Sequence, residues 1–199
     1  MSILYYVPII HPIEDYGSLG PAIKNAFTRR VGEARFNQLQ KEIYQYWQIT
    51  EERINKAIPD VRGLIIYHDG FPVGEREKIL VLFGHIYREH PESPNFRLIK
   101  KLLDKGAILE GTEDMSLVIE QIEIYQRAAQ AVSLEEQQQI LAVEASRSNE
   151  IMKLRDVFIT RRINDTLSES KRGILFIGRD HNVLEELEKL SDKFTIIHL

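Results

Sequence analysis

The stretch that decides the fold is RGILFIGRDHNVL, residues 172–184. Residues 173–177 form a short apolar run bounded by glycines, too short for a buried helix and rich in the Ile and Phe that strands favour. Because the run is continuously apolar rather than alternating, we predict a strand covered on both faces, as in parallel sheets. Gly178 ends this strand.

A strand-to-helix turn follows. Asp180 or Asn182 can cap a helix that we predict over residues 182–190. His181 therefore lies at the carboxyl end of a buried strand, and in open α/β sheets such turns are where ligands bind.

The rest of the chain alternates strands and helices in the same manner, which predicts an α/β domain with a largely parallel sheet. Further strands are expected over residues 3–10, 64–67, 107–109 and 194–198, with a polar loop between the first strand and the first helix. Helices are expected over residues 19–31, 33–58, 79–87, 94–105, 114–131 and 133–167, the last with a candidate break at 146–149. We predict one domain, residues 1–199, with about five strands, helices packed around the sheet, and long helical insertions over about 33–58 and 114–167.

Composition narrows the class of protein. The 26 basic residues are scattered among 30 acidic ones and form no basic stripe, which argues against a nucleic-acid partner. There is no apolar run near 18 residues, so no membrane span is expected. The amino-terminal residues lack the features of a signal peptide, and we expect a cytoplasmic protein. The absence of cysteine excludes a disulfide, a thiolate nucleophile and a zinc–sulfur site.

Polar residues follow each predicted strand. If the strands are parallel, these residues meet at one edge of the sheet, where a cleft is expected. They are His11, Glu14 and Asp15 after the first strand, Asp69 after the second, Glu110 and Glu113 after the third, and His181 after the fourth. Two alternatives stay open: Asp69-Gly70 can be a simple turn, and Thr112 can cap the helix that follows it.

Two arginines can extend this edge. Arg155 and Arg162 are seven residues apart and lie on nearly the same line of the predicted helix over 133–167. From there they can clamp a carboxylate or a phosphate. Alternatively, Arg155 forms a surface ion pair, for example with Glu150.

These elements resemble the TraB/Tiki, ChaN and erythromycin-esterase-like superfamily. The resemblance is best over residues 152–184, where MKLRD (152–156) and GRDH (178–181) are similar to that group's Arg-containing helix and Gly-x-x-His element. PIIH (8–11) stands where the group has a first Gly-x-x-His, with proline in place of glycine. The chain also resembles a prokaryotic family that opens with a strand, a His-Pro or His-Thr pair and a Gly-Ser-Leu helix, to which we attach no activity.

The resemblance implies a cleft with two histidines, one or two carboxylates and an arginine. Members of the group act as metal-dependent proteases, as esterases in which a histidine activates water, or as haem-iron binders. We therefore expect a hydrolase acting on a small molecule or a peptide. His181 is expected as base or metal ligand, Glu113 or Glu110 as acid/base or ligand, and Arg155 as oxyanion or carboxylate clamp.

The remaining roles follow from position. Asp15 is expected to orient a histidine, and Arg162, Asp69 and Glu14 are expected to bind substrate. His11, His181 and Glu110 are the candidate ligands of a divalent metal, since histidine and carboxylate form a workable hydrolytic ligand set.

Three alternatives remain. In a metal-free site, His181 is a general base paired with Glu113 or Asp15. In a non-catalytic protein, the cleft holds a small anion, a metal or haem for a regulatory or assembly role. In a structural protein, the long helices drive self-association into a homo-oligomer. Independently of these alternatives, each histidine can instead cap a helix or hydrogen-bond a strand-end carbonyl.

Overall fold

The computed structural model describes residues 1–169, 171–190 and 193–199. Within them, five strands form one parallel sheet in the order β3-β2-β4-β1-β5. The strands are β1 (Ser2–Ile9), β2 (Ile65–His68), β3 (Ile108–Glu110), β4 (Arg172–Gly178) and β5 (Phe194–His198). The helices are η1 (Ile13–Leu19, a 3₁₀-helix), α1 (Gly20–Val31), α2 (Glu33–Ala57), α3 (Arg76–Glu89), α4 (Pro94–Asp104), α5 (Met115–Ala129), α6 (Leu134–Thr166) and α7 (Val183–Glu188). The predicted α/β fold is confirmed.

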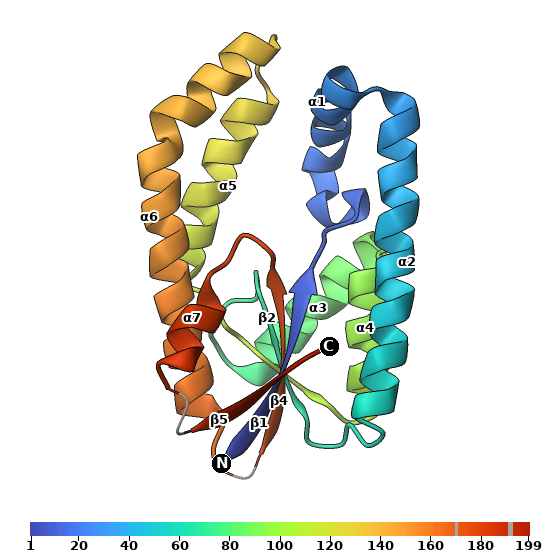
Figure 1. Ribbon diagram of the computed structural model, residues 1–199, viewed down its shortest axis with the longest axis vertical. Helices are drawn as coiled ribbons and strands as arrows, with labels where there is room; N and C mark the ends of the chain where they lie inside the picture. Colours follow the sequence, from blue (N-terminus) through green and yellow to red (C-terminus); the bar gives the residue numbers. More distant parts are fainter. Residues whose placement is uncertain (170, 191–192) are drawn as a thin grey trace.

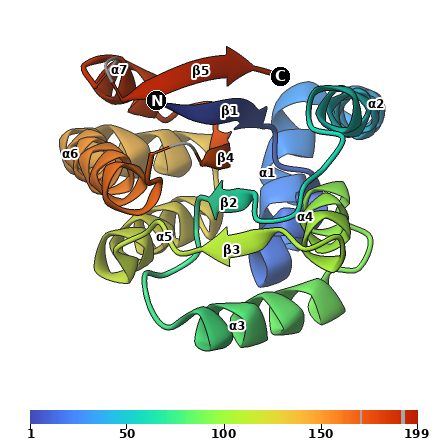
Figure 2. The same ribbon diagram turned by 90° about the horizontal axis from the view of Figure 1, so that it is seen from below.

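The central strand β4 shows why the apolar run is continuous. Successive side chains of a strand point to opposite faces. Ile174 and Phe176 accordingly pack into one apolar core, together with residues of α2, α3 and α4. Leu175 and Ile177 pack into the other, with residues of α6 and α7. The domain thus has three layers, with the sheet between two sets of helices (Figure 2).

Two helical pairs extend beyond the carboxyl ends of the strands (Figure 1). One arm consists of α1 and α2, and the other of α5 and α6. The arms stand on either side of the strand ends, and α1 contacts α5 between them. The helical insertions predicted from the sequence therefore flank the edge at which a ligand site was expected.

A proline inside β1 is tolerated because of where the neighbouring strand ends. Pro8 pairs with Ile177 of β4, but the ladder between β1 and β5 stops at Tyr6. Proline lacks the N–H that a fully paired strand needs on both sides, so it fits where only one neighbour remains.

Some local predictions were wrong. The long helix α6 has no break at residues 146–149, where it packs along α5 and Arg147 donates to Glu120 of α5 at 2.6 and 2.7 Å. The segment after β1 is not a loop but the 3₁₀-helix η1. The amino-terminal cap of α5 is Asp114, whose carboxylate accepts from the N–H of Ser116. Thr112 instead donates to the carbonyl of His68.

In the part of the chain that is described, no helix combines the length and the apolarity needed to cross a membrane.

Candidate functional site

A cavity of about 720 Å³ opens at the carboxyl edge of the sheet, between the two arms. Its floor comes from the residues that follow β1, β2 and β4, and its walls come from α1, α2, α5 and α6. The polar lining residues include His11, Asp15, Tyr16, Gln40, His68, Asp69, Asn95, Gln121, Tyr125, Arg155, Arg179, Asp180 and His181. The predicted cleft at the strand ends is therefore present.

His181 is held by a carboxylate from a helix. Its Nδ1 lies 2.5 Å from Asp156 Oδ1, and because an ionised carboxylate can only accept, the ring nitrogen donates. The other oxygen, Asp156 Oδ2, accepts from the backbone N–H of Asn182 at 2.9 Å, at the start of α7. Both side chains are buried, with 5% and 7% exposure. The partner of His181 is thus Asp156 on α6, and not Glu113 or Asp15 as predicted.

His11 is held in the same manner by Asp15. The His11 Nδ1 atom lies 3.1 Å from Asp15 Oδ2, the contact expected of a carboxylate that orients a histidine. Burial lowers the pKa of His11, but the hydrogen bond to Asp15 and the charges of Asp69, Asp15 and Asp180 outweigh it and raise that pKa above its usual value. His11 therefore gains a proton more readily than a free histidine.

The two histidines converge above Gly178. A methyl group placed on Gly178 would lie 3.2 Å from Asp69 Oδ2, 3.5 Å from the His181 ring and 3.8 Å from His11 Nε2. The backbone N–H of Gly178 donates to Asp69 Oδ2 at 2.7 Å. Glycine at this position leaves the space in which the three side chains meet, and any larger residue would fill it.

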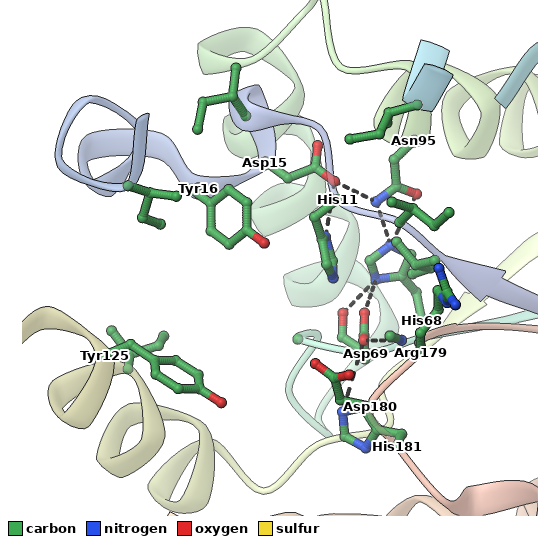
Figure 3. A pocket seen from close by; sticks show the side chains of 18 of the residues that line it. His11, Asp15, Tyr16, His68, Asp69, Asn95, Tyr125, Arg179, Asp180 and His181 are labelled. Carbon is green, nitrogen blue, oxygen red and sulfur yellow. Dashed lines mark hydrogen bonds and ion pairs between the residues drawn. The ribbon is translucent and has the colours of Figure 1, made fainter. Parts of the chain in front are cut away.

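Asp69 lies at the centre of this group (Figure 3). Its Oδ2 is 4.0 Å from His181 Nε2, and its side chain is 9% exposed. Burial would raise the pKa of Asp69, but His68, His11 and His181 and the N–H of Gly178 hold it below the ordinary value. Asp69 is therefore a buried anion that the surrounding histidines stabilise.

A second layer of polar contacts holds the carboxylates of Asp15 and Asp69 in place. The Nδ1 of His68 donates to the Asp69 carbonyl at 2.5 Å, and its Nε2 lies 3.0 Å from the Asn95 amide nitrogen. Asn95 also donates to Asp15 Oδ2 at 3.2 Å, and the Ser93 hydroxyl donates to Asp15 Oδ1 at 2.5 Å. His68, Ser93 and Asn95 are all buried, so the positions of Asp15 and Asp69 are tied to one internal network.

Helix α2 anchors the end of β1. The Tyr46 hydroxyl donates to the Pro8 carbonyl, and the Trp47 Nε1–H donates to the Ile10 carbonyl at 3.0 Å. These aromatic residues hold the backbone that presents His11.

Glu113 and Arg155 bind each other. The guanidinium donates to Glu113 from Nη2 at 2.5 Å and from Nε at 3.2 Å, and its Nη1 donates to Gln121 Oε1 at 2.7 Å. Glu113 is 1% exposed and Arg155 is 9% exposed. Arg155 lines the cavity, whereas Glu113 lies behind it and does not, and the alternative of a surface ion pair with Glu150 is wrong. All three guanidinium nitrogens already have partners, so Arg155 is not free to clamp a ligand in this conformation.

Three other predicted residues do not line the cavity. Arg162 donates to Glu110 at 2.5 Å and to the Gly111 carbonyl at 3.3 Å. Glu110, the third candidate metal ligand, is thereby separated from His11 and His181. Glu14 lies against Tyr44, whose pKa is raised to about 12 by burial and by this carboxylate. Among the residues that the structure describes, no group of three or more His, Asp or Glu is arranged to hold a metal ion.

Sequence reasoning missed several residues of the site. Asp156 carried a usable signal, because it shares a buried stripe of α6 with Ile159 and Ile163 at helical spacing, where a charged residue needs a partner. Arg179 and Asp180 lie inside the quoted motif and line the cavity, but the sequence pattern indicates only a turn residue and a candidate helix cap there. Asn95 had no sequence signal, since its role depends on how α4 packs beneath the strand ends.

Comparisons of the chain with protein-family models, with curated proteins and with solved structures gave no match.

Proposed function

We propose that this cavity is the active site of a hydrolase, in which His181 acts as general base and His11 as general acid. The observation that carries the proposal is the matched geometry of the two histidines. Each is bound through Nδ1 to a carboxylate of its own, and both rings approach one point above Gly178. The Nδ1 contacts fix the ring orientation and leave Nε2 for proton transfer, the arrangement that a general base requires.

The reaction would proceed by direct attack of water on an acyl carbon. His181 Nε2 takes a proton from the water as its oxygen bonds to that carbon, and Asp156 stabilises the imidazolium that forms. The bond to the leaving group then breaks, and the leaving atom takes a proton from His11 Nε2. Because its pKa is raised, His11 is well placed to be protonated beforehand. The products are an acid and an alcohol or amine, and both histidines are reset by exchanging their protons with water.

Arg179 is the cation we assign to the developing oxyanion. It lines the cavity, and within the described residues it has no ion-pair partner, in contrast to Arg155. Preorganised positive charge at an oxyanion lowers the barrier of acyl transfer. The proposal retains the hydrolase expectation from the superfamily resemblance. The carboxylates that hold the two histidines are, however, those of Asp156 and Asp15 rather than that of Glu113.

The test is a turnover screen with ester and amide substrates, followed by single variants. We expect His181→Ala and His11→Ala to lower kcat/KM by about 10²–10⁴-fold, the usual contribution of a general acid or base. Asp156→Asn should lower it as well, because the amide cannot stabilise the imidazolium. His85→Ala is the matched control, since His85 lies on α3 and does not line the cavity. Full turnover by a folded His181→Ala variant would refute the assignment.

A metal-binding version of the same site is the second candidate. Histidines that bind metals usually donate their other ring N–H to a carboxylate, which is the contact that both histidines make. Asp69 would then replace Glu110 as the third ligand, and the side chains would have to draw together from the present 4.0 Å between His181 Nε2 and Asp69 Oδ2. A thermal-shift series with Mn²⁺, Co²⁺, Zn²⁺ and Fe²⁺ tests this, because a ligand at a hundredfold excess over its Kd stabilises the fold by about 2.7 kcal/mol. No shift with any of these ions would remove this candidate.

A further inference from the structure

We propose that the cavity selects a neutral or cationic amphiphile whose apolar or aromatic body lies between the two helical arms, with its reacting group at the histidines. This inference rests on the proposed function and adds the class of substrate. It is carried by three features of the cavity: its apolar walls, a pair of tyrosines from opposite sides, and an acidic floor.

The walls of the cavity are apolar on both sides. The arm of α1 and α2 contributes Ile23, Phe27, Phe36, Leu39 and Ile43, and the arm of α5 and α6 contributes Val118, Ile122, Tyr125 and Met152. Ile122 remains 39% exposed although it lines the cavity. A cavity of about 720 Å³ with apolar side chains on both walls lies within the size range of sites that hold a drug-sized organic molecule.

Tyr16 and Tyr125 lie on different sides of the cavity, to the left of the histidines in Figure 3. Tyr16 belongs to η1 and Tyr125 to α5, and their side chains keep 40% and 47% exposure. Burial, followed by the charges of Asp15 and Asp180 and the nearby Tyr125, raises the pKa of Tyr16, so its hydroxyl stays neutral. Two neutral phenol rings at the entrance suit an aromatic or apolar body rather than a highly charged one.

The floor of the cavity is acidic. Asp15, Asp69 and Asp180 line it, and Asp156 lies directly behind His181. Glu113 neutralises Arg155, which leaves Arg179 as the unpaired arginine of the described lining. Even with His11 protonated, an anionic ligand would meet more negative than positive charge at this floor, which disfavours it.

The test uses two fluorescent probes that share one ring system. N-phenylnaphthylamine is neutral and anilinonaphthalene sulfonate is an anion, and the emission of each rises in apolar surroundings. We expect the neutral probe to bind the intact protein in a one-to-one complex, at least about tenfold more tightly than the sulfonate, where tenfold corresponds to about 1.4 kcal/mol. Equal affinities, or tighter binding of the sulfonate, would overturn the charge selection.

A matched pair of variants places the probe in the cavity. Ile122 lines the cavity, whereas Ile119, one helical turn earlier on α5, is 51% exposed and does not line it. Ile122→Asp should weaken binding of the neutral probe by about tenfold or more, and Ile119→Asp should leave it within about twofold. If both variants weaken binding equally, the probe lies elsewhere and the inference fails.

A failure of the ligand-class proposal can be distinguished from a failure of the proposed hydrolase function. His181→Ala tests the proposed function through turnover, whereas Ile122→Asp and its control Ile119→Asp test the ligand class through probe binding. Probe binding without hydrolysis of any substrate would refute the proposed hydrolase activity but support the proposed class of ligand. The ligand class alone would be refuted if the protein hydrolyses esters but binds no probe, and if kcat/KM does not rise along a series from p-nitrophenyl acetate to longer neutral acyl chains.

Discussion

Replacing Glu113 with glutamine tests whether Arg155 is structural or free to bind a ligand. The substitution keeps the shape of the side chain but removes its charge, and it leaves the Arg155 guanidinium buried at 9% exposure. Two of the four guanidinium contacts go to Glu113, at 2.5 and 3.2 Å, and only those to Gln121 at 2.7 Å and to the Met152 sulfur at 4.0 Å would remain unchanged. The amide that replaces the carboxylate would also place an N–H against one of the guanidinium N–H groups.

The expected cost follows from this burial. Breaking a buried ion pair by removing one partner costs about 3–5 kcal/mol, because the remaining charge is uncompensated. In a domain of this size, a change of about 1 kcal/mol shifts Tm by roughly 2–4 °C, so Glu113→Gln should lower Tm on the order of 10 °C. The free energy of unfolding, from urea denaturation, is the primary measurement.

The double variant Glu113→Leu/Arg155→Met is the control. Replacing a buried pair by apolar residues of similar volume is often neutral or stabilising, so the double variant should recover most of the loss. A loss below about 1 kcal/mol in Glu113→Gln would show that the guanidinium is solvated, like that of a surface ion pair. Arg155 would then return as the oxyanion clamp in place of Arg179.

Two further predictions concern the site and its support. Asp15→Asn should lower the pKa of His11, which is followed by an NMR titration of the ring. Because the His11 pKa is raised in the fold, its charged form stabilises the protein below about pH 6.5, and this contribution is lost as pH rises through the folded pKa. The Asp15→Asn variant should therefore lose more stability at about pH 5 than at about pH 9. An equal loss of stability at the two pH values would contradict the charge argument. Gly111→Ala should cost about 3 kcal/mol or more, since its Cβ would lie 2.0 Å from the Pro72 carbonyl oxygen. Gly84→Ala in α3, where nothing lies within 4 Å, should instead stabilise by about 0.5–1 kcal/mol, and the two are compared by urea unfolding.

The sheet and its ligand edge were predictable because both depend on local pattern. A glycine-bounded apolar run such as residues 173–177 needs cover on both faces, and parallel strands place their carboxyl ends together. His11, Asp69 and His181 immediately follow such strands, so their meeting followed from the strand assignments alone.

The partners of these side chains were not predictable in the same manner, because helices supply them through tertiary packing. Asp156 reaches His181 only because α6 packs on the sheet beside α7. Glu113 and Arg155 were each expected to face a ligand, but residues 42 apart in sequence show no sign that their opposite charges meet. The unbroken helix at Arg147 has the same cause, since its anchor lies on α5.

The placement of β4 between β1 and β2 has a consequence for synthesis of the chain on the ribosome. The strands that carry His11 and Asp69 are made early, yet neither can pair with the other, because the strand made after residue 171 belongs between them. Until then, both expose unpaired edges and apolar faces, the condition in which nascent chains aggregate or recruit chaperones. Insertion of β4 joins β1 to β2 and brings His181 to the cavity in the same event, so the proposed site can form only after both halves of the sheet have been made.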